Sequence, residues 1–256
     1  MLKRILFCVL LLTALRVDAT DYTDIWYLPA QAGWGANVVQ SDKFLFVTFF
    51  IYGADNKPTW YTAQLTLDAS GNYNGKLYAT TGTYYAMPWK ASDLTQAEVG
   101  TASFQPTSPY TANLIWIVTA GQITTAKAIQ RQSLTQITIG GSYVFAQSGV
   151  YSSCPTSSNN GAYSDFGGLQ VTQSSGGAVL FTFTYQNLSC TFSGTLTQFG
   201  KLYVMPATAY KCSDGTDTQA AMGEITATAL GIEGRFSAPV SSGGCREDAT
   251  FSGVLH

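Results

Sequence analysis

The sequence predicts an all-β protein made of two small antiparallel domains, each a barrel or a sandwich with little helix. Short runs rich in aromatic and β-branched residues alternate with turn residues along the chain. No segment sustains apolar residues at the 3.6-residue period of a helix. The connections are also too short to hold crossover helices, so neighbouring strands should pair antiparallel.

The clearest element is a hairpin over residues 44–67. Residues 44–52 form an aromatic and β-branched run, 53–58 carry turn residues, and 59–67 form a second run. Alternation in the second run places four apolar residues on one face: Tyr61, Ala63, Leu65 and Leu67. We expect this face to form the inside of one wall of a barrel.

The first strand of this hairpin is apolar on both faces. Phe44, Phe46 and Phe50 share one face, while Phe49 and Ile51 belong to the other. We expect Phe49 and Ile51 to point out of the barrel, where a bare apolar strip would invite aggregation. The sequence therefore predicts that the second domain, or a partner chain, packs on this strip.

The other strands follow from the same signals. In the first half, eight strands are expected at residues 25–28, 36–40, 44–52, 59–67, 74–81, 99–105, 112–118 and 122–130. In the second half, eight are expected at residues 142–146, 168–173, 179–186, 190–198, 201–205, 223–229, 232–236 and 249–255. A linker-like segment, 132–136, separates the halves, so the domains are predicted at 20–135 and 136–256.

A short repeat links the two halves. The tetrapeptide Gly-Lys-Leu-Tyr occurs at residues 75–78 and again at 200–203. A further glycine follows the first glycine of each copy, after 25 residues at Gly100 and after 23 residues at Gly223. These similar offsets would fit two copies of one barrel.

The first 19 residues have the pattern of a secretory signal peptide. Lys3 and Arg4 precede an apolar segment, 5–15, and residues 17–19 provide a small-residue cleavage site. The apolar segment is shorter than the roughly 20 residues that a membrane-spanning helix needs. We therefore expect a secreted or periplasmic chain that begins near Thr20 and does not span a membrane.

Four cysteines remain after this segment: Cys154, Cys190, Cys212 and Cys245. An even number of cysteines in an exported chain indicates disulfides. We expect Cys154 to pair with Cys190, and Cys212 with Cys245, because both bridges would join loop ends. Pairing of Cys154 with Cys245 or with Cys212 stays open if the barrel brings its first and last strands together.

The charge pattern argues against nucleic acid as a partner. Charged residues make up 11% of the chain and the formal net charge is −2. No run of Lys or Arg exceeds an isolated pair, whereas phosphate binding needs clustered cations.

Residues for catalysis are scarce. The single histidine is His256, so neither a Ser-His-Asp triad nor a multi-histidine zinc site can form. We predict no catalytic residue, no metal and no cofactor. A hydrolase that uses two carboxylates remains the alternative, since glycosidases need only a pair about 5 to 9.5 Å apart. Its candidates are Asp24, Asp55, Asp165, Glu224, Glu233, Glu247 and Asp248.

Residues 24–132 resemble a module of exported bacterial proteins. The resemblance rests on two patterns, Trp26-Tyr27-x-Pro29-x-x-x-Gly33-Trp34-Gly35-x-Asn37 and Tyr52-x-x-Asp55-x-x-Pro58-x-Trp60. Members of the family more often have a second Trp where this chain has Tyr27. The resemblance implies a bacterial secreted β-module and brings no activity with it. A looser similarity, to the avidin and lipocalin class of ligand-binding barrels, rests on strand number and early Trp residues.

Aromatic residues in loops are the best candidates for a binding site. Trp and Tyr stack on sugar faces and anchor protein partners, and side chains in loops are commonly exposed to solvent. The predicted ligand-binding residues are Trp34, Trp60, Tyr84, Tyr85 and Trp89. The sequence thus predicts a non-catalytic binding module for a glycan, a small apolar ligand or a protein partner.

Overall fold

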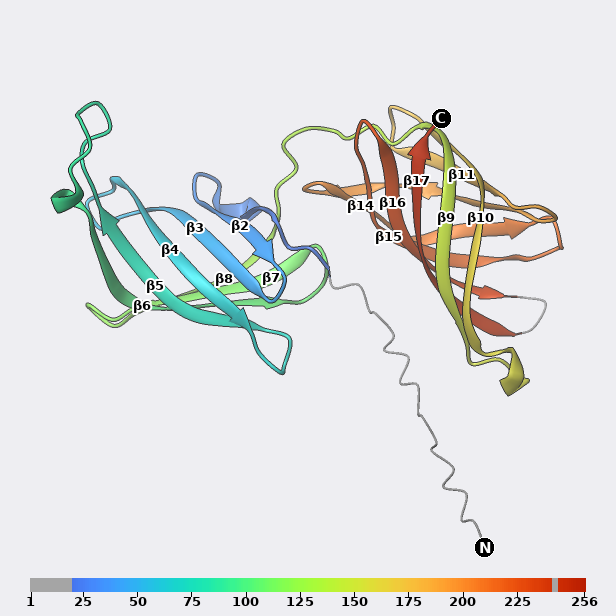
Figure 1. Cartoon of the computed structure of the whole chain (residues 1–256), viewed down its shortest axis with the longest axis horizontal. Helices are drawn as coiled ribbons and strands as arrows, with labels where there is room; N and C mark the ends of the chain where they lie inside the picture. Colours follow the sequence, from blue (N-terminus) through green and yellow to red (C-terminus); the bar gives the residue numbers. More distant parts are fainter. Residues whose placement is uncertain (1–19, 241–243) are drawn as a thin grey trace, which may run out of the picture.

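The computed structural model describes residues 20–240 and 244–256, which form two closed antiparallel barrels (Figure 1). The predicted signal peptide, residues 1–19, lies outside the described part of the chain. Helix in the described residues is limited to three short 3-10 turns, η1 (Pro29–Gln31), η2 (Ala91–Asp93) and η3 (Ser157–Asn159). The predicted all-β class with two antiparallel barrels is therefore confirmed.

Barrel 1 is an eight-stranded meander in which each strand pairs with the next and the last pairs with the first. Its strands are β1 (Asp24–Tyr27), β2 (Gly35–Ser41), β3 (Phe44–Tyr52), β4 (Pro58–Leu67), β5 (Tyr73–Thr81), β6 (Thr95–Pro106), β7 (Thr111–Val118) and β8 (Ile123–Arg131). Eight strands enclose a space just wide enough for side chains to fill. Fully buried side chains occupy it here, among them Trp26, Leu45, Phe49, Leu65, Leu77, Phe104 and Leu114.

Strand β3 turns inward the face that was expected to point outward. Phe49 is fully buried opposite Tyr61 of β4, while Phe50 is 57% exposed opposite Trp60. Ile51 is half-buried and packs against the same core. The expectation that Phe49 and Ile51 point outward was wrong, because the pairing with β4 fixes which face of β3 meets the core.

Barrel 2 has the same up-and-down order. Its strands are β9 (Gly141–Ser152), β10 (Gly161–Gln173), β11 (Ala178–Thr184), β12 (Ser189–Thr195), β14 (Leu202–Cys212), β15 (Asp217–Ala227), β16 (Gly231–Val240) and β17 (Cys245–Leu255). Pairing of β9 with β17 and of β12 with β14 closes it, and the short β13 (Thr197–Phe199) pairs with the start of β14. Its core is rich in phenylalanine, including Phe145, Phe181, Phe183 and Phe192.

The repeated tetrapeptide lies on equivalent strands. Its first copy is in β5, the fifth strand of barrel 1, and its second copy leads into β14, the fifth strand of barrel 2 when β13 is set aside. Gly75 is needed where it stands, because a Cβ atom there would lie 1.8 Å from the carbonyl oxygen of Gln64. A larger residue would push β4 and β5 apart. The placement of the two copies fits the interpretation that the barrels are two copies of one unit.

Both disulfides form within barrel 2, but with a different pairing from the one expected. Cys190 is bonded to Cys212, and Cys154 to Cys245, with Cα separations of 4.0 and 4.1 Å. Cys190 and Cys212 are direct partners across β12 and β14. Cys154 follows β9, whose Ser152 pairs with Arg246 of β17. The predicted pairing was wrong because closure of the barrel, not loop position, decides which cysteines meet.

The barrels meet through one end of barrel 1. The guanidinium of Arg131, in the last residue of β8, donates to the Asp24 carboxylate and to three backbone carbonyl oxygens. Asp24 also accepts the backbone N–H of Lys201 in barrel 2. In the β6–β7 turn, the Tyr110 hydroxyl accepts the backbone N–H of Glu224 at 2.7 Å. We call this the proximal end of barrel 1, and the opposite end the distal end.

The outer face of β3 stays uncovered by barrel 2. Phe44, Phe46 and Phe50 are 37%, 38% and 57% exposed. The expectation that the second domain packs on β3 was therefore wrong, since barrel 2 contacts the proximal end instead. The strip of Phe49 and Ile51, for which a partner chain was the other predicted cover, needs none, because it faces the core of barrel 1.

Candidate functional site

Four loops converge at the distal end of barrel 1. Strand β6 runs from this end to the proximal β6–β7 turn, and antiparallel pairing brings the β1–β2, β3–β4, β5–β6 and β7–β8 connections to the same side. All five aromatic residues proposed from the sequence lie at this end: Trp34, Trp60, Tyr84, Tyr85 and Trp89. In Figure 1 it is the part of the molecule farthest from barrel 2.

The β5–β6 connection forms a projecting arm, residues 79–97. Strand β5 stops pairing with β4 at Tyr78, and beyond it pairs only with β6, from Ala79 opposite Ala97 to Thr81 opposite Thr95. This two-stranded extension stands out from the barrel wall (Figure 1). Helix in the arm is limited to the single turn η2, because residues from Thr95 onward extend β6.

Threonine side chains hold the tip of the arm. The Thr83 hydroxyl lies within hydrogen-bond distance of two acceptors for its one proton, the Lys90 carbonyl and the Asp93 carboxylate, and it accepts the Lys90 backbone N–H at 2.9 Å. Near the base, the Thr81 and Thr95 hydroxyls lie 2.6 Å apart. These local hydrogen bonds give the tip a defined shape in the absence of a core.

The tip and the neighbouring hairpin carry large apolar side chains in solvent. Seven side chains, each more than half exposed, make up what we call the distal aromatic surface: Phe50, Tyr52, Trp60, Tyr84, Tyr85, Met87 and Trp89. Tyr85 is 90% exposed and packs edge-on against Tyr84, with ring centroids 4.7 Å apart. Folded monomers seldom leave so many rings bare without a partner for them.

Trp34 has a different role from the other four candidates. It is half-buried and packs on Trp116 with ring centroids 6.0 Å apart, and the Lys127 ammonium lies 5.9 Å above its ring. Its indole nitrogen is buried with no hydrogen-bond partner in the structure. Trp34 therefore packs on the barrel 1 core at its distal mouth.

Sequence reasoning missed three members of this surface. Phe50 and Tyr52 were overlooked because their strand was expected to turn its other face outward. Met87 lies between the proposed aromatic residues of the arm and was missed because the candidates were chosen among aromatic side chains. The β3 alternation, oriented by the inner face of β4, is the signal that identifies Phe50 and Tyr52 as outward residues.

Most carboxylates proposed for a hydrolase are engaged elsewhere. Asp24 is tied to Arg131 at the barrel junction, Asp248 pairs with Arg246, and Asp55 lies in an exposed turn beside Lys57. Asp165, Glu224 and Glu233 line a groove on barrel 2, in which Glu224 pairs with Arg235 at 3.2 Å.

Glu247 points into barrel 2 and is only 5% exposed. Its carboxylate accepts a hydrogen bond from the Tyr163 hydroxyl, and Gln147 connects that hydroxyl to Tyr185. Burial raises the pKa of Glu247 above its ordinary value; the bond from Tyr163 opposes this rise and the charge of Asp165 adds to it. An acid so shielded is poorly placed to meet a substrate.

Among the described residues, no group of three or more His, Cys, Asp or Glu side chains could hold a metal ion. Within the same residues, no helix has the length and apolar character to cross a membrane.

The fold and this surface define a two-barrel protein with a filled first barrel and exposed rings at its distal end. No protein-family model and no curated protein matches the chain. Among solved structures, it is similar to a point mutant of the vaccine antigen transferrin binding protein B from Haemophilus parasuis Hp5, with 9% identity and a TM-score of 0.32. A second is the isotype 1 transferrin binding protein B from serogroup B Neisseria meningitidis, with 10% identity and a TM-score of 0.23.

These alignments cover 89% and 88% of this chain, and 66% of each of the other chains. The chain thus spans slightly less than two thirds of the length of the structures it matches. The barrel assignment rests on the strand pairing.

Proposed function

We propose that the protein is an exported, non-catalytic binding module that docks a protein partner through its distal aromatic surface. The observation that carries the proposal is the gathering of seven large, exposed apolar side chains at the end of barrel 1 that faces away from barrel 2. Tyr, Trp and Met are enriched in protein interfaces, and Tyr and Trp provide most of their strongest contacts.

The shape of the surface favours a protein over a small ligand. Small-molecule sites are concave and enclose most of the ligand. Barrel 1 offers no such interior, because its rings and leucines are fully buried against one another and Trp34 packs over its mouth. A projecting arm with apolar rings is instead suited to enter a groove on another protein.

The arm also keeps its shape before binding. The hydrogen bonds of Thr83 to Lys90 and Asp93 fix the tip. A preformed loop loses less conformational entropy on association, so more of its contact energy contributes to affinity.

Export is supported by the cysteine chemistry. All four cysteines of the described chain are joined in disulfides, and disulfides persist in oxidising compartments outside the cytosol. The basic and apolar pattern of residues 1–19 points to the same destination.

The test compares retention of exported proteins by immobilised residues 20–256 and by two triple variants. The arm variant carries Tyr85→Ser, Met87→Ser and Trp89→Ser. The control carries Val144→Ser, Leu230→Ser and Val254→Ser, which remove equally exposed apolar side chains from barrel 2. We expect one protein to bind the wild type and the control, and to bind the arm variant at least about tenfold more weakly.

A partner that binds the arm variant with unchanged affinity contradicts the proposal. So does a glycan that occupies the arm in place of a protein. Circular dichroism of each variant confirms that any loss arises at the surface rather than from unfolding.

A further inference from the structure

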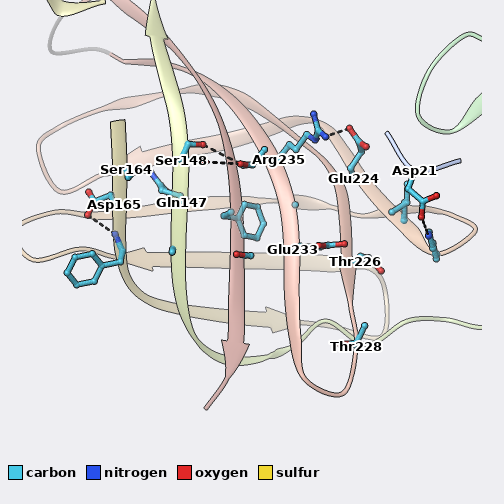
Figure 2. A pocket seen from close by; sticks show the side chains of 18 residues that line it. Asp21, Gln147, Ser148, Ser164, Asp165, Glu224, Thr226, Thr228, Glu233 and Arg235 are labelled. Atoms are coloured by element: carbon cyan, nitrogen blue, oxygen red, sulfur yellow. Dashed lines mark hydrogen bonds and ion pairs between the residues drawn. The ribbon is translucent and has the colours of Figure 1, made fainter. Parts of the chain in front are cut away.

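The outer wall of barrel 2 is hollowed into a groove of about 1070 Å³. It crosses five neighbouring strands, β10, β9, β17, β16 and β15, and ends near Asp21 and Lys201 at the barrel junction. In Figure 2, Asp165 and Asp21 mark its two ends, with the pair Glu224 and Arg235 between them. Strands lie about 4.8 Å apart, so four intervals give a groove about 19 Å long. The groove is therefore long enough for an extended ligand.

Residues with hydroxyl groups make up a third of the eighteen residues that line the groove. Five of them are at outward positions on its strands, Ser148, Ser164, Thr226, Thr250 and Ser252, and the sixth, Thr228, directly follows β15. Ser148 and Thr250 face each other across β9 and β17, with their oxygens 3.3 Å apart. A hydroxyl both donates and accepts hydrogen bonds, which suits a ligand whose own groups do the same.

The charged groups of the groove oppose an acidic ligand. Four carboxylates line it, against two cations. The cations already contact acids: Lys201 lies 2.6 Å from Asp21, and Arg235 lies 3.2 Å from Glu224. Phosphate or uronate groups would therefore meet net negative charge.

An exposed ring stands at the end near Asp165. Phe166 is on the outer face of β10 and is 76% exposed. Its face is free to stack on the apolar face of a flat ring.

We propose that this groove binds a neutral oligosaccharide. Such a ligand can donate hydrogen bonds to the six groove hydroxyls and accept hydrogen bonds from them. It can also donate to Glu233 and Glu224, accept from Arg235, and stack on Phe166. A peptide strand fits less well, because the backbone of a closed barrel offers no free edge for pairing. The site is separate from the distal aromatic surface, so it does not depend on the protein-docking proposal.

Barrel 1 helps to shape this groove. Strand β15 shifts register between Gly223 and Thr226, and Glu224 adopts a φ of 49° in that bulge. The backbone N–H of Glu224 is held by the Tyr110 hydroxyl of barrel 1 at 2.7 Å. Tyr110 is thus a positioning residue, since it fixes the strand that presents Glu224 to Arg235.

The test titrates residues 20–256 with four neutral probes, cellohexaose, maltohexaose, mannohexaose and chitohexaose, by calorimetry. Hexagalacturonate and a lysine hexapeptide serve as controls. We expect at least one neutral hexasaccharide to bind, and Phe166→Ala and Glu233→Ala each to weaken it about tenfold. Both residues are exposed, so the fold should survive these changes. The arm variant should bind the sugar as the wild type does.

Tyr110→Phe supplies an independent readout, because it keeps the ring and removes only the hydroxyl. We expect weaker sugar binding, a changed amide NMR signal for Glu224, and unchanged unfolding of barrel 2. Failure of every neutral probe to bind overturns the proposal. So does binding that neither Phe166→Ala nor Glu233→Ala weakens, or binding of the lysine hexapeptide alone.

Discussion

Asp24 and Arg131 form a buried ion pair, 3.1 Å between carboxylate and guanidinium, that lies where the two barrels meet. The Arg131 side chain has no exposed surface, and its guanidinium stacks 4.9 Å from the Trp26 ring centroid. The same Asp24 oxygen accepts the Lys201 backbone N–H at 3.1 Å. One carboxylate therefore both neutralises the buried cation of barrel 1 and holds barrel 2.

Asp24→Ala should destabilise the protein by about 3 kcal/mol, because it leaves the Arg131 charge buried without its counter-ion. Chemical denaturation measures the loss. The matched control is Asp217→Ala, which removes an equally close but exposed pair with Lys211 and should change stability little. Equal effects of the two substitutions would show that the junction pair contributes no more than a surface pair.

Glu247→Gln should flatten the pH dependence of stability. The folded-state pKa of Glu247 is raised above 4.5, so the native state binds more protons than the unfolded state once the pH exceeds that value. The contribution of Glu247 to the free energy of unfolding is therefore fully present at low pH, and it falls as the pH rises from about 4.5 through the raised pKa. Gln keeps an acceptor for Tyr163 without the charge.

Urea unfolding at pH 4, 6 and 8 checks this expectation. The variant should be more stable than the wild type at pH 8 and no more stable at pH 4. Each unit of pKa difference corresponds to about 1.4 kcal/mol. A wild type whose stability rises between pH 4 and 8 while the variant follows the same curve contradicts the assignment.

The two disulfides should contribute unequally. Cys154–Cys245 spans 91 residues and Cys190–Cys212 spans 22, so the chain-entropy estimate gives about 4.6 and about 3.4 kcal/mol. Paired Cys→Ser variants, compared by denaturation, measure both contributions. Non-reducing peptide mapping should yield a peptide that joins Cys190 to Cys212, and a Cys154 to Cys190 peptide would disprove this connectivity.

Truncation of two tryptophans should change stability by very different amounts. Trp26 is fully buried, so Trp26→Ala should cost about 3 to 5 kcal/mol. Trp89 is 65% exposed on the arm, so Trp89→Ala should change the unfolding free energy by less than about 0.5 kcal/mol. Thermal unfolding of both variants distinguishes them. A large loss of stability in Trp89→Ala would mean that the arm packs on the barrel in solution.

The eight strands of barrel 1 were predictable because each carries its own signal. Alternation in β4 placed Ala63 and Leu65 inside, and the turn before Pro58 fixed the hairpin. In barrel 2 the strands were found, but six of the eight were predicted too short. Strand β10, for example, begins at Gly161 with mostly exposed residues that pair with β9, so no alternation of apolar and polar residues marks them.

The chain by itself determined the all-β class, the exposed aromatic residues of the arm and the presence of disulfides, because these depend on local pattern and residue type. Tertiary structure decided which face of β3 is inside, which cysteines meet, and how serine and threonine residues from five strands form one groove. Each of these depends on strand register and barrel closure, which bring together residues far apart in sequence. The orientation of Phe49 shows the difference: its strand was evident, but only pairing with Tyr61 turned it inward.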